Sequence, residues 1–344
     1  MGKKRSVAGL GITLLAMAGF CAGACRGKAP VENGTGGEQS PAGVQASAEA
    51  GPLYWQVLTE KDGEYIADRE GNTIPLARYR RIVLFSPGAI ETLFLIGAED
   101  SIAAIPSVRG SIWPEEKTRL LPVVGSTSRP NVETVISFEP DLIIGNTMTL
   151  ELIADLNRRG YRAIIHGSYF IEDIFNSTLL MGRLTGREAE AEALITEQRG
   201  RLAAIRSELK KQPLDLKGAF IYAADPIMAF TDKTLAGEIL TILGTRNIAQ
   251  GLSAAQPILS PEYILDQNPD FLFGALSFTK IEDVLSADPV ILQTRAGKEK
   301  NINIIPSSLF LRPSPRIVEN LWELYGEVKK FAAKSSPSGD ESKP

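Results

Sequence analysis

Cysteine and histidine are almost absent from this sequence. Among its 344 residues there are two cysteines, Cys21 and Cys25, and a single histidine, His166. Both cysteines lie within the first 25 residues, so the rest of the chain has no thiols with which to form a disulfide. A site that holds a free zinc or manganese ion through several histidines is also excluded. We therefore expect neither a resident metal ion nor a cofactor.

The sequence also lacks an excess of positive charge and the usual motifs of nucleotide chemistry. The formal net charge is −4, and no basic cluster follows residue 30, so nucleic-acid binding is not expected. There is no Walker A sequence and no G-x-G-x-x-G turn. A hydrolase that uses Ser86 and His166 is an alternative, but "LFSPGA" around Ser86 is not a G-x-S-x-G elbow. A purely structural exported protein is a further alternative.

The N-terminus has the pattern of an export signal. Basic residues 3–5 precede the apolar run 6–20, which is too short to span a membrane comfortably, and small residues 22–24 precede Cys25. This arrangement resembles a bacterial lipobox, in which the cysteine thiol receives a lipid anchor. Ordinary signal-peptide cleavage beside an incidental cysteine is the alternative. We expect an exported protein that is attached to the membrane through the lipid on Cys25 alone, on a periplasmic or cell-surface face.

The remaining composition divides the chain into a tether, a folded body and a tail. The segment up to about residue 52 is rich in Gly, Ala, Ser, Pro and Glu, as flexible tethers are, and the body alternates short β-branched runs with helical patterns. This alternation predicts an α/β fold with two Rossmann-like lobes. The expected boundaries are 1–24 (signal peptide), 25–52 (lipidated cysteine and tether), 53–170 (N-terminal lobe), 171–186 (interdomain helix), 187–333 (C-terminal lobe) and 334–344 (disordered tail).

Two similar stretches indicate that the lobes are built alike. "NVETVISFEPDLII" (131–144) and "SPEYILDQNPDFLF" (260–273) each place a glutamate, Glu133 or Glu262, seven residues before a Pro-Asp pair. Glu91 likewise precedes a glycine by six residues, as Glu238 does. A rigid helix between two such lobes would limit their movement, and a ligand is expected between them, beyond the carboxyl ends of the strands.

Several stretches together resemble a known family. "DREGNTIPLARYRRIVLFSPGAIETLFLIGAEDSIAAI", "LPVVGSTSRPNVETVISFEPDLIIG", "MGRLTGREAEAEALI" and "RPSPRIVENLWEL" are similar, in order and spacing, to the helix-linked (class III) substrate-binding proteins of bacterial ABC importers. That family serves ferric siderophores, haem and vitamin B12, and some members handle oxyanions. The resemblance implies a binding protein rather than an enzyme, with a membrane permease as partner, and we expect a monomer. It also implies that Glu133 and Glu262 dock onto permease arginines; two solvated carboxylates favoured by helix dipoles are the alternative.

The ligand is expected to be a small-molecule metal chelate held by residues that follow strand ends. These candidates are Arg109, Trp113, Arg129, Asn146, His166, Tyr169, Tyr222, Met228, Phe230 and Arg312. The arginines, with Arg316, favour an anionic ferric siderophore, because guanidinium groups match carboxylate and catecholate oxygens. Bracing of the final helix is an alternative for Arg312, and we prefer it for Arg316. His166, Tyr222, Met228 and Phe230 have interior packing as their alternative.

The same family comparison leaves other cargoes open. Where vitamin B12 binders of this family carry tryptophans, this chain has Thr127 and Asn146, which argues against a corrinoid. The loop before Glu133 has neither Tyr nor His, which argues against haem. Cobalamin, haem and an oxyanion such as molybdate therefore stand as alternatives to a ferric siderophore.

Overall fold

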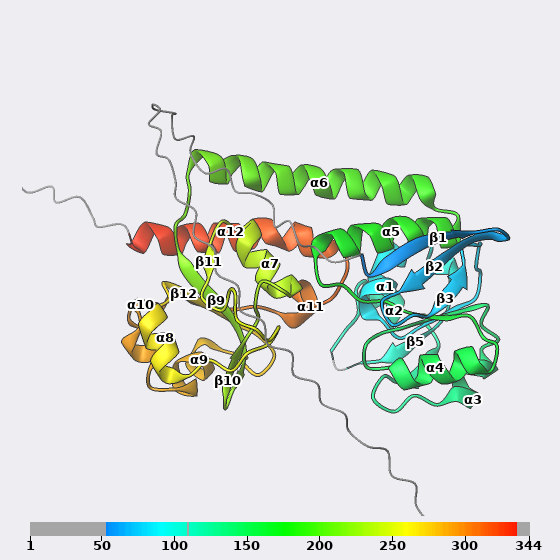
Figure 1. Ribbon diagram of the computed structural model, residues 1–344, viewed down its shortest axis with the longest axis horizontal. Coiled ribbons are helices and arrows are strands. Elements are labelled where there is room, and N and C mark those ends of the chain that lie inside the picture. Colours follow the sequence, from blue (N-terminus) through cyan, green and yellow to red (C-terminus); the bar gives the residue numbers. More distant parts are fainter. Residues whose placement is uncertain (1–52, 109, 336–344) are drawn as a thin grey trace, which may run out of the picture. The chain divides into compact units, whose positions relative to one another are not determined.

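A computed structural model of the protein describes residues 53–108 and 110–335 (Figure 1). The expected signal peptide, Cys25 with its tether, Arg109 and the tail from residue 336 lie outside the described residues. Within the described part of the chain, no helix combines the length and the apolar composition needed to cross a membrane.

The first element is a small antiparallel sheet that the sequence patterns do not predict. It consists of β1 (Trp55–Glu60), β2 (Gly63–Asp68) and β3 (Thr73–Pro75). Every β1 residue after Trp55 is exposed, so this strand has no apolar alternation by which to recognise it. Trp55 itself is buried, and its indole N–H donates to the Ile165 carbonyl oxygen at 2.6 Å. The sheet is therefore anchored where a later strand ends.

The first half of the body is a parallel sheet with the order β6-β5-β4-β7-β8. Its strands are β4 (Ile82–Leu84), β5 (Ile102–Ser107), β6 (Val123–Ser126), β7 (Leu142–Gly145) and β8 (Ala163–Ile165). The helical segments between them are α1 (Pro87–Leu95), η1 (Glu99–Ser101), α2 (Glu115–Thr118), α3 (Val132–Ser137) and α4 (Leu150–Arg158). This strand order is that of a doubly wound sheet. Strands β5 and β6 are added on one side of β4 and strands β7 and β8 on the other, so the switch point lies between β4 and β7.

The second half of the body is a mixed sheet with the order β10-β9-β12-β13, and β11 also pairs with β9. Its strands are β9 (Lys217–Ala224), β10 (Ile227–Ala229), β11 (Arg246–Asn247), β12 (Phe271–Gly274) and β13 (Ile302–Ile304). Its helical segments are α7 (Leu235–Ile242), α8 (Pro261–Gln267), α9 (Ile281–Ala287), η2 (Ile291–Gln293), α10 (Arg295–Lys298), α11 (Ser307–Phe310) and α12 (Arg316–Ser335). Separate apolar clusters cover the two faces of this sheet.

Helix α5 (Ile171–Thr185) follows β8 and belongs to the cores of both halves. Its first turns place Ile171, Ile174 and Phe175 in the core of the second half. Its last turns place Leu180, Met181 and Leu184 in the core of the first half. After α5, the long helix α6 (Glu188–Lys211) packs along both α5 and α12 (Figure 1). A two-lobed α/β fold with a helical connection, as predicted, is confirmed.

The repeated Pro-Asp pairs do the same structural work in each half. The carboxylate of Asp141 accepts hydrogen bonds from the backbone N–H groups of Arg80 and Arg81, just before β4. The carboxylate of Asp270 accepts one from the backbone N–H of Lys217, at the start of β9. Since β7 pairs with β4 and β12 pairs with β9, each aspartate joins the beginnings of two neighbouring parallel strands.

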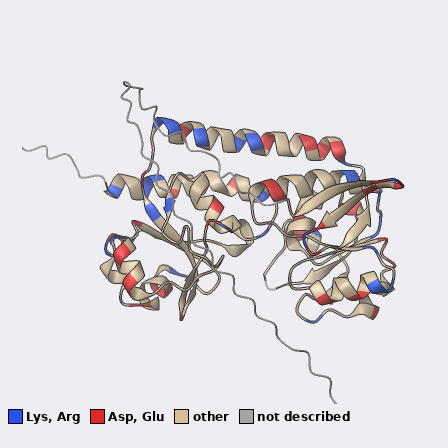
Figure 2. Cartoon of the chain, in the orientation of Figure 1, with Lys and Arg blue, Asp and Glu red and all other residues tan. Residues whose placement is uncertain are grey.

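Charged side chains of both signs are interspersed over the described residues (Figure 2). In helix α6 the first turn carries Glu188 and Glu190 and the last turn carries Lys210 and Lys211, with charges of both signs between them. That order complements the helix dipole and adds stability to a helix that is largely exposed.

Candidate functional site

The carboxyl ends of β4 and β7 lie side by side at the switch point of the first sheet. Ligands of doubly wound folds bind outside such a switch point. Here the Asn146 side-chain N–H donates to the Phe85 carbonyl oxygen at 2.8 Å, and the Asn146 side-chain oxygen accepts from the Met148 N–H at 2.9 Å. The Asn146 side chain therefore shapes this edge through hydrogen bonds to the backbone of Phe85 and Met148.

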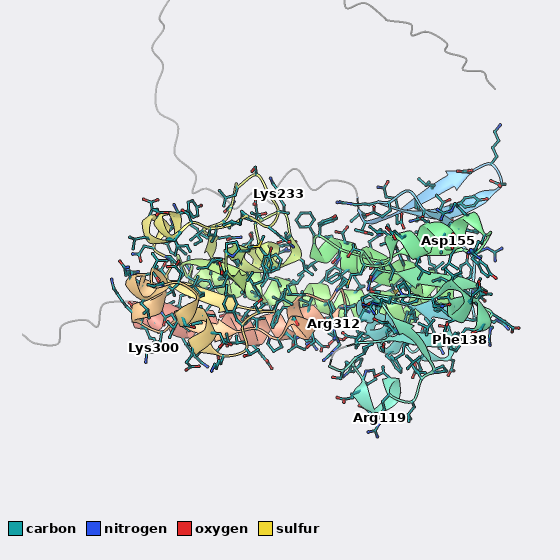
Figure 3. The ribbon with its side chains drawn as sticks, turned by 90° about the horizontal axis from the view of Figure 1, so that it is seen from below. Arg119, Phe138, Asp155, Lys233, Lys300 and Arg312 are labelled. Atoms are coloured by element: carbon teal, nitrogen blue, oxygen red, sulfur yellow. The ribbon has the colours of Figure 1, made fainter. Side chains whose placement is uncertain are left out.

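The strand-end segments of the two sheets contact each other around Arg312, which is labelled in Figure 3. The Arg312 guanidinium, which follows β13 and α11, donates to the Ser111 carbonyl oxygen at 2.9 Å, in the loop that follows β5. It also donates to Glu91 Oε1 at 3.1 Å, on helix α1. Packing is equally close nearby, because a Cβ on Gly88 would collide with the carbonyl of Pro313.

Arg316 joins the same contact and orients Trp113. Its guanidinium lies 3.5 Å from Glu91 Oε2 and 4.6 Å from the centroid of the Trp113 ring. Glu91 is 1% exposed, whereas Trp113 is 37% exposed. Both arginines are thus paired to one buried carboxylate. For Arg316 this is the bracing role that we prefer from the sequence, and Arg312 has a bracing contact of the same kind.

Glu238, the counterpart of Glu91, holds the beginning of the connecting helix α5. Its carboxylate on α7 accepts a hydrogen bond from the Ile171 N–H at 2.6 Å, at the beginning of α5. Burial raises the pKa of Glu238 to about 7, and the charges of Asp173 and Glu172 add to this effect. The sequence reveals Glu91 and Glu238 only as markers of a repeat, because their partners are far away along the chain.

His166 lies in the interior, not at an exposed edge. It is 1% exposed; Nδ1 lies 2.8 Å from Ser86 Oγ and Nε2 lies 3.3 Å from Ser177 Oγ. Burial lowers its pKa to about 3, so the imidazole is neutral at physiological pH. Ser86 and His166 are brought together, as a hydrolase would need, but both are buried and the second ring nitrogen faces a hydroxyl instead of a carboxylate.

Tyr169 follows β8 and is 38% exposed. Its ring lies 5.9 Å from that of Tyr54, and the Arg69 guanidinium lies 4.6 Å from its centroid. Tyr54 and Arg69 come from the small N-terminal sheet and its connections, which the sequence patterns do not predict. The segment at residues 53–75 therefore contributes to this edge of the molecule.

The three candidates of the second sheet form one aromatic cluster. Tyr222 and Phe230 stack with centroids 4.5 Å apart, and the Tyr222 hydroxyl lies 3.5 Å from the Met228 sulfur. Phe230 is 7% exposed and belongs to the core, so the interior alternative describes its position. Tyr222 and Met228 are only partly buried, at the end of the sheet.

Several of the exposed apolar side chains lie in segments that follow strand ends. Besides Trp113 and Tyr169, these include Met148 (66% exposed) after β7, Leu276 (56%) after β12 and Ile258 (61%), which bridges to Met228. Sequence reasoning missed Met148, Leu276 and Ile258, because their exposure depends on the tertiary structure. Arg129 is also exposed there, in the loop after β6. Apolar side chains exposed at the carboxyl ends of strands can offer contact area to a ligand.

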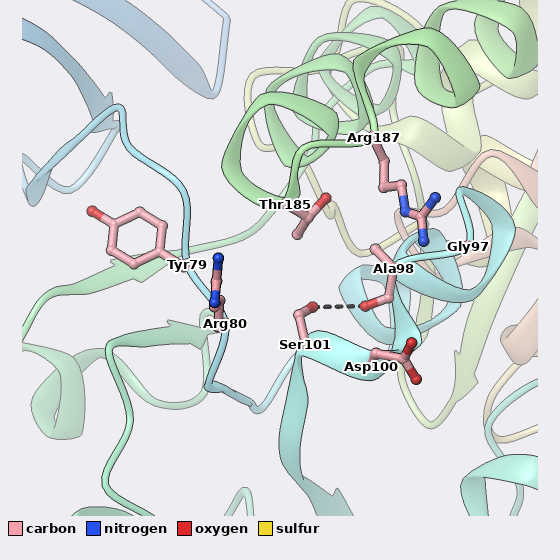
Figure 4. Close-up of a pocket in the computed structure, with 8 residues that line it drawn as sticks. All are labelled: Tyr79, Arg80, Gly97, Ala98, Asp100, Ser101, Thr185 and Arg187. Carbon is pink, nitrogen blue, oxygen red and sulfur yellow. Dashed lines mark hydrogen bonds between the residues drawn. The ribbon is translucent and has the colours of Figure 1, made fainter.

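A hollow of about 250 Å³ lies at the opposite ends of these strands (Figure 4). Its lining comes from the approach to β4, the end of α1, η1 and the α5–α6 junction. The lining residues are Tyr79, Arg80, Gly97, Ala98, Asp100, Ser101, Thr185 and Arg187. Because β4 and β5 begin here, the hollow is not at the edge where doubly wound folds bind ligands.

Glu133 and Glu262 occupy the same position on equivalent helices. Each is the second residue of its helix, and each helix has a side-chain N-cap. The Asn131 side chain accepts a hydrogen bond from the Thr134 N–H, and the Ser260 side chain accepts one from the Tyr263 N–H. The Glu133 side chain is 80% exposed and lies 3.8 Å from Arg159. Hydrogen bonds from its own backbone N–H and from Ser260 lower the pKa of Glu262, which is also exposed. The structure thus presents two matched carboxylates.

Comparison with known proteins gives the family. A family model described as "Periplasmic binding protein" matches residues 82–309. Among curated relatives, a cobalamin-binding protein of Halobacterium salinarum is 28% identical over 247 residues, which are 70% of this chain and 66% of that protein. The matched part thus spans slightly less than two thirds of that relative's length. The petrobactin-binding protein YclQ of Bacillus subtilis is 25% identical over a match that covers 69% of this chain and 75% of that protein.

Solved structures show the same fold. The periplasmic haem-binding protein RhuT of Roseiflexus sp. RS-1, in its apo form, superimposes with a TM-score of 0.65 and 22% identity, over 74% of this chain and 99% of that one. The family and these neighbours are solute-binding proteins, which confirms the prediction of a binding protein rather than an enzyme and leaves the hydrolase alternative without support. The chain belongs to the periplasmic binding protein family, in its helix-linked, class III form.

Proposed function

We propose that this protein is the substrate-binding component of an ABC importer, which captures a metal chelate and delivers it to a membrane permease. The observation that carries the proposal is the contact between strand-end segments of the two sheets, around Ser111 and Arg312, beside exposed apolar side chains. A ligand held there would touch both halves of the protein. The names of the relatives, which bind cobalamin and petrobactin, agree with this class of ligand.

The charges favour a chelate of low net charge, such as cobalamin, even though Thr127 and Asn146 stand where vitamin B12 binders of the family carry tryptophans. Two of the four arginines on which a ferric siderophore was expected, Arg312 and Arg316, are paired to Glu91. An anionic chelate would have to compete with that carboxylate for them. Trp113, Tyr169 and Met148 instead offer apolar and aromatic contact area. This arrangement weakens the electrostatic reason for preferring a siderophore.

A ferric siderophore is the second candidate, and Arg129 is the observation that favours it. This side chain is exposed in the loop after β6, so its guanidinium can meet an anionic oxygen of a ligand. Similarity to a petrobactin-binding protein points in the same direction.

Two finer parts of the proposal concern the membrane. Glu133 and Glu262 dock onto the permease, and Cys25 carries the lipid anchor. The matched positions of the two carboxylates on α3 and α8 support the first part. For the second, replacing Cys25 with Ser is expected to move the protein from the membrane fraction to the soluble fraction; retention in the membrane fraction would contradict it.

The experiment that tests the ligand class is thermal unfolding of the full chain with cyanocobalamin, haemin, a ferric tris-catechol siderophore and molybdate. A ligand at 100 times its Kd adds about 2.7 kcal/mol to the free energy of unfolding. We expect cyanocobalamin to raise the Tm and the Trp113→Ala and Tyr169→Ala variants to lose that shift. Trp322→Ala is the control, since Trp322 is half-exposed on α12. A shift with the siderophore alone would select the second candidate, and no shift with any chelate would contradict the proposal.

A further inference from the structure

The carboxylate of Glu91 is buried, but its contacts lead to an exposed part of the proposed ligand site. Glu91 lies on α1 and is 1% exposed. A buried carboxylate requires paired partners, and Glu91 finds two, Arg312 on Oε1 at 3.1 Å and Arg316 on Oε2 at 3.5 Å. Both arginines belong to the segment that enters α12, more than two hundred positions later in the chain.

Each of these arginines also holds one part of the same loop. Arg312 donates to the Ser111 carbonyl oxygen at 2.9 Å. Arg316 lies over the face of the Trp113 ring, with its guanidinium carbon 4.6 Å from the centroid. One carboxylate thus orients two guanidinium groups, and these groups fix both ends of the segment 111–113. The exposed edge of Trp113 is left for a ligand.

We propose that Glu91 is a positioning residue for ligand binding: it holds Arg312 and Arg316 so that they fix Trp113 at the edge shared by the two halves. Glu91 itself does not touch the ligand. The part of this inference that concerns affinity rests on the proposed function, whereas the part that concerns Trp113 does not.

Glu238 provides a matched control within the same molecule. It occupies the equivalent position on α7, but its carboxylate accepts from the Ile171 N–H at the beginning of α5. The charged groups that act on Glu238 (Asp173, Glu172 and Arg206) lie on α5 and α6, not in residues 111–113. If Glu91 acted only as a buried structural carboxylate, the two glutamates would respond alike when neutralised.

The first measurement is acrylamide quenching of tryptophan fluorescence in the full chain with Trp322→Phe as background. Of the two remaining tryptophans, Trp55 is buried, so the quencher reports on Trp113. Glu91→Gln is expected to raise the quenching constant of the ligand-free protein clearly, and Glu238→Gln is expected to leave it unchanged. An unchanged constant in folded Glu91→Gln, or an equal change in both variants, would overturn the proposal.

A second variant keeps the test decisive if Glu91→Gln does not fold. Arg316→Lys preserves a positive charge for Glu91 but removes the planar group that stacks on Trp113. It is expected to raise the quenching of Trp113 in a folded protein. The proposal is overturned if Arg316→Lys leaves Trp113 as protected as in the parent chain.

Affinity is then measured by equilibrium dialysis of cyanocobalamin. Glu91→Gln and Arg316→Lys are expected to weaken binding about tenfold, a change of the size of one partly desolvated cation–π contact. Glu238→Gln is expected to bind as the parent does. If the parent chain does not bind cyanocobalamin, the ligand proposal fails while the quenching result still decides the role of Glu91. If the parent binds and Glu91→Gln binds equally well, the positioning role is wrong.

Discussion

Two ionisable side chains, the buried His166 and the partly buried Glu238, make the stability of this protein depend on pH in opposite directions. Burial lowers the pKa of His166 and raises that of Glu238, because in each case the neutral form is favoured in the interior. A group of either kind titrates differently in the folded and unfolded chains, which links its pKa to the free energy of unfolding.

For His166, the contribution to stability is lost as the pH falls. The pKa is about 3 in the folded protein and 6.5 in the unfolded chain, so the unfolded chain takes up the proton first. Between pH 7 and pH 5 the free energy of unfolding is expected to fall by about 2 kcal/mol through this residue. Urea unfolding at both pH values measures it. His166→Gln, which keeps hydrogen-bonding groups but does not titrate, is expected to show a smaller fall, and an equal fall would contradict the assignment.

For Glu238, stability is lost as the pH rises. The folded protein holds its proton up to about pH 7, whereas the unfolded chain releases it near pH 4.5. The contribution is fully present below pH 4.5 and is lost as the pH rises through 7, by about 3 kcal/mol. Glu238→Gln is expected to be more stable than the parent at pH 8 and similar to it at pH 4.5. A parent and variant with parallel pH profiles in urea unfolding would refute this.

The sequence was least able to predict the role of single side chains, such as whether a given residue is available to a ligand. His166 and Arg312 were identified as polar residues that follow strand ends, and they do follow strand ends. Whether such a side chain faces solvent depends on what covers it, and Trp55 from the unpredicted N-terminal sheet packs edge-on against His166 with ring centroids 5.6 Å apart. Arg312 is likewise paired by Glu91, 221 positions away.

At the scale of elements, local patterns predicted the longer helices and the central strands of both sheets. The α3 and α8 helices begin within the two repeated stretches, after the caps Asn131 and Ser260. Each capping bond joins residues only three apart, so a local pattern is enough to indicate it. The small sheet of β1, β2 and β3 and the short strands β6, β10, β11 and β13 were missed, since none of them was recognised by its apolar pattern.

The start of α1 illustrates how closely one element can be packed. Gly88→Ala would place a methyl group against the Pro313 carbonyl, so it is expected to destabilise the protein by about 1–3 kcal/mol. Thermal unfolding measures the change. Gly200→Ala on α6 is the control, because nothing lies within 4 Å of its added Cβ, and it is expected to stabilise by up to about 1 kcal/mol. A stabilising Gly88→Ala would show that α1 and the 312–316 segment are not in firm contact.

At the scale of the whole molecule, the duplication of the two halves leads to a prediction about transport. Replacing both Glu133 and Glu262 with Ala is expected to leave ligand affinity unchanged and to reduce uptake by about tenfold or more, because two charged contacts with the permease are lost. Uptake of labelled ligand by cells and equilibrium dialysis of the purified protein measure the two quantities.

The matched control for that experiment replaces Glu151 and Glu282. These are also exposed glutamates at the second position of helices, α4 and α9, but they are outside the repeated stretches. Their double alanine variant is expected to support normal uptake. Equal loss of uptake in both double variants, or loss of ligand affinity in the Glu133 and Glu262 variant, would show that the docking surface is elsewhere.

The sequence by itself determined the class of fold, the repeat and the family, because these follow from local periodicity and from the order of short motifs. Only the tertiary structure decided which candidate residues are available to a ligand. It paired Arg312 and Arg316 with Glu91, buried His166 between two serines and left Trp113, Met148 and Tyr169 exposed. The reason is physical: a helix or strand is specified by neighbours in the chain, whereas the burial and charge state of a side chain are set by distant residues that pack against it.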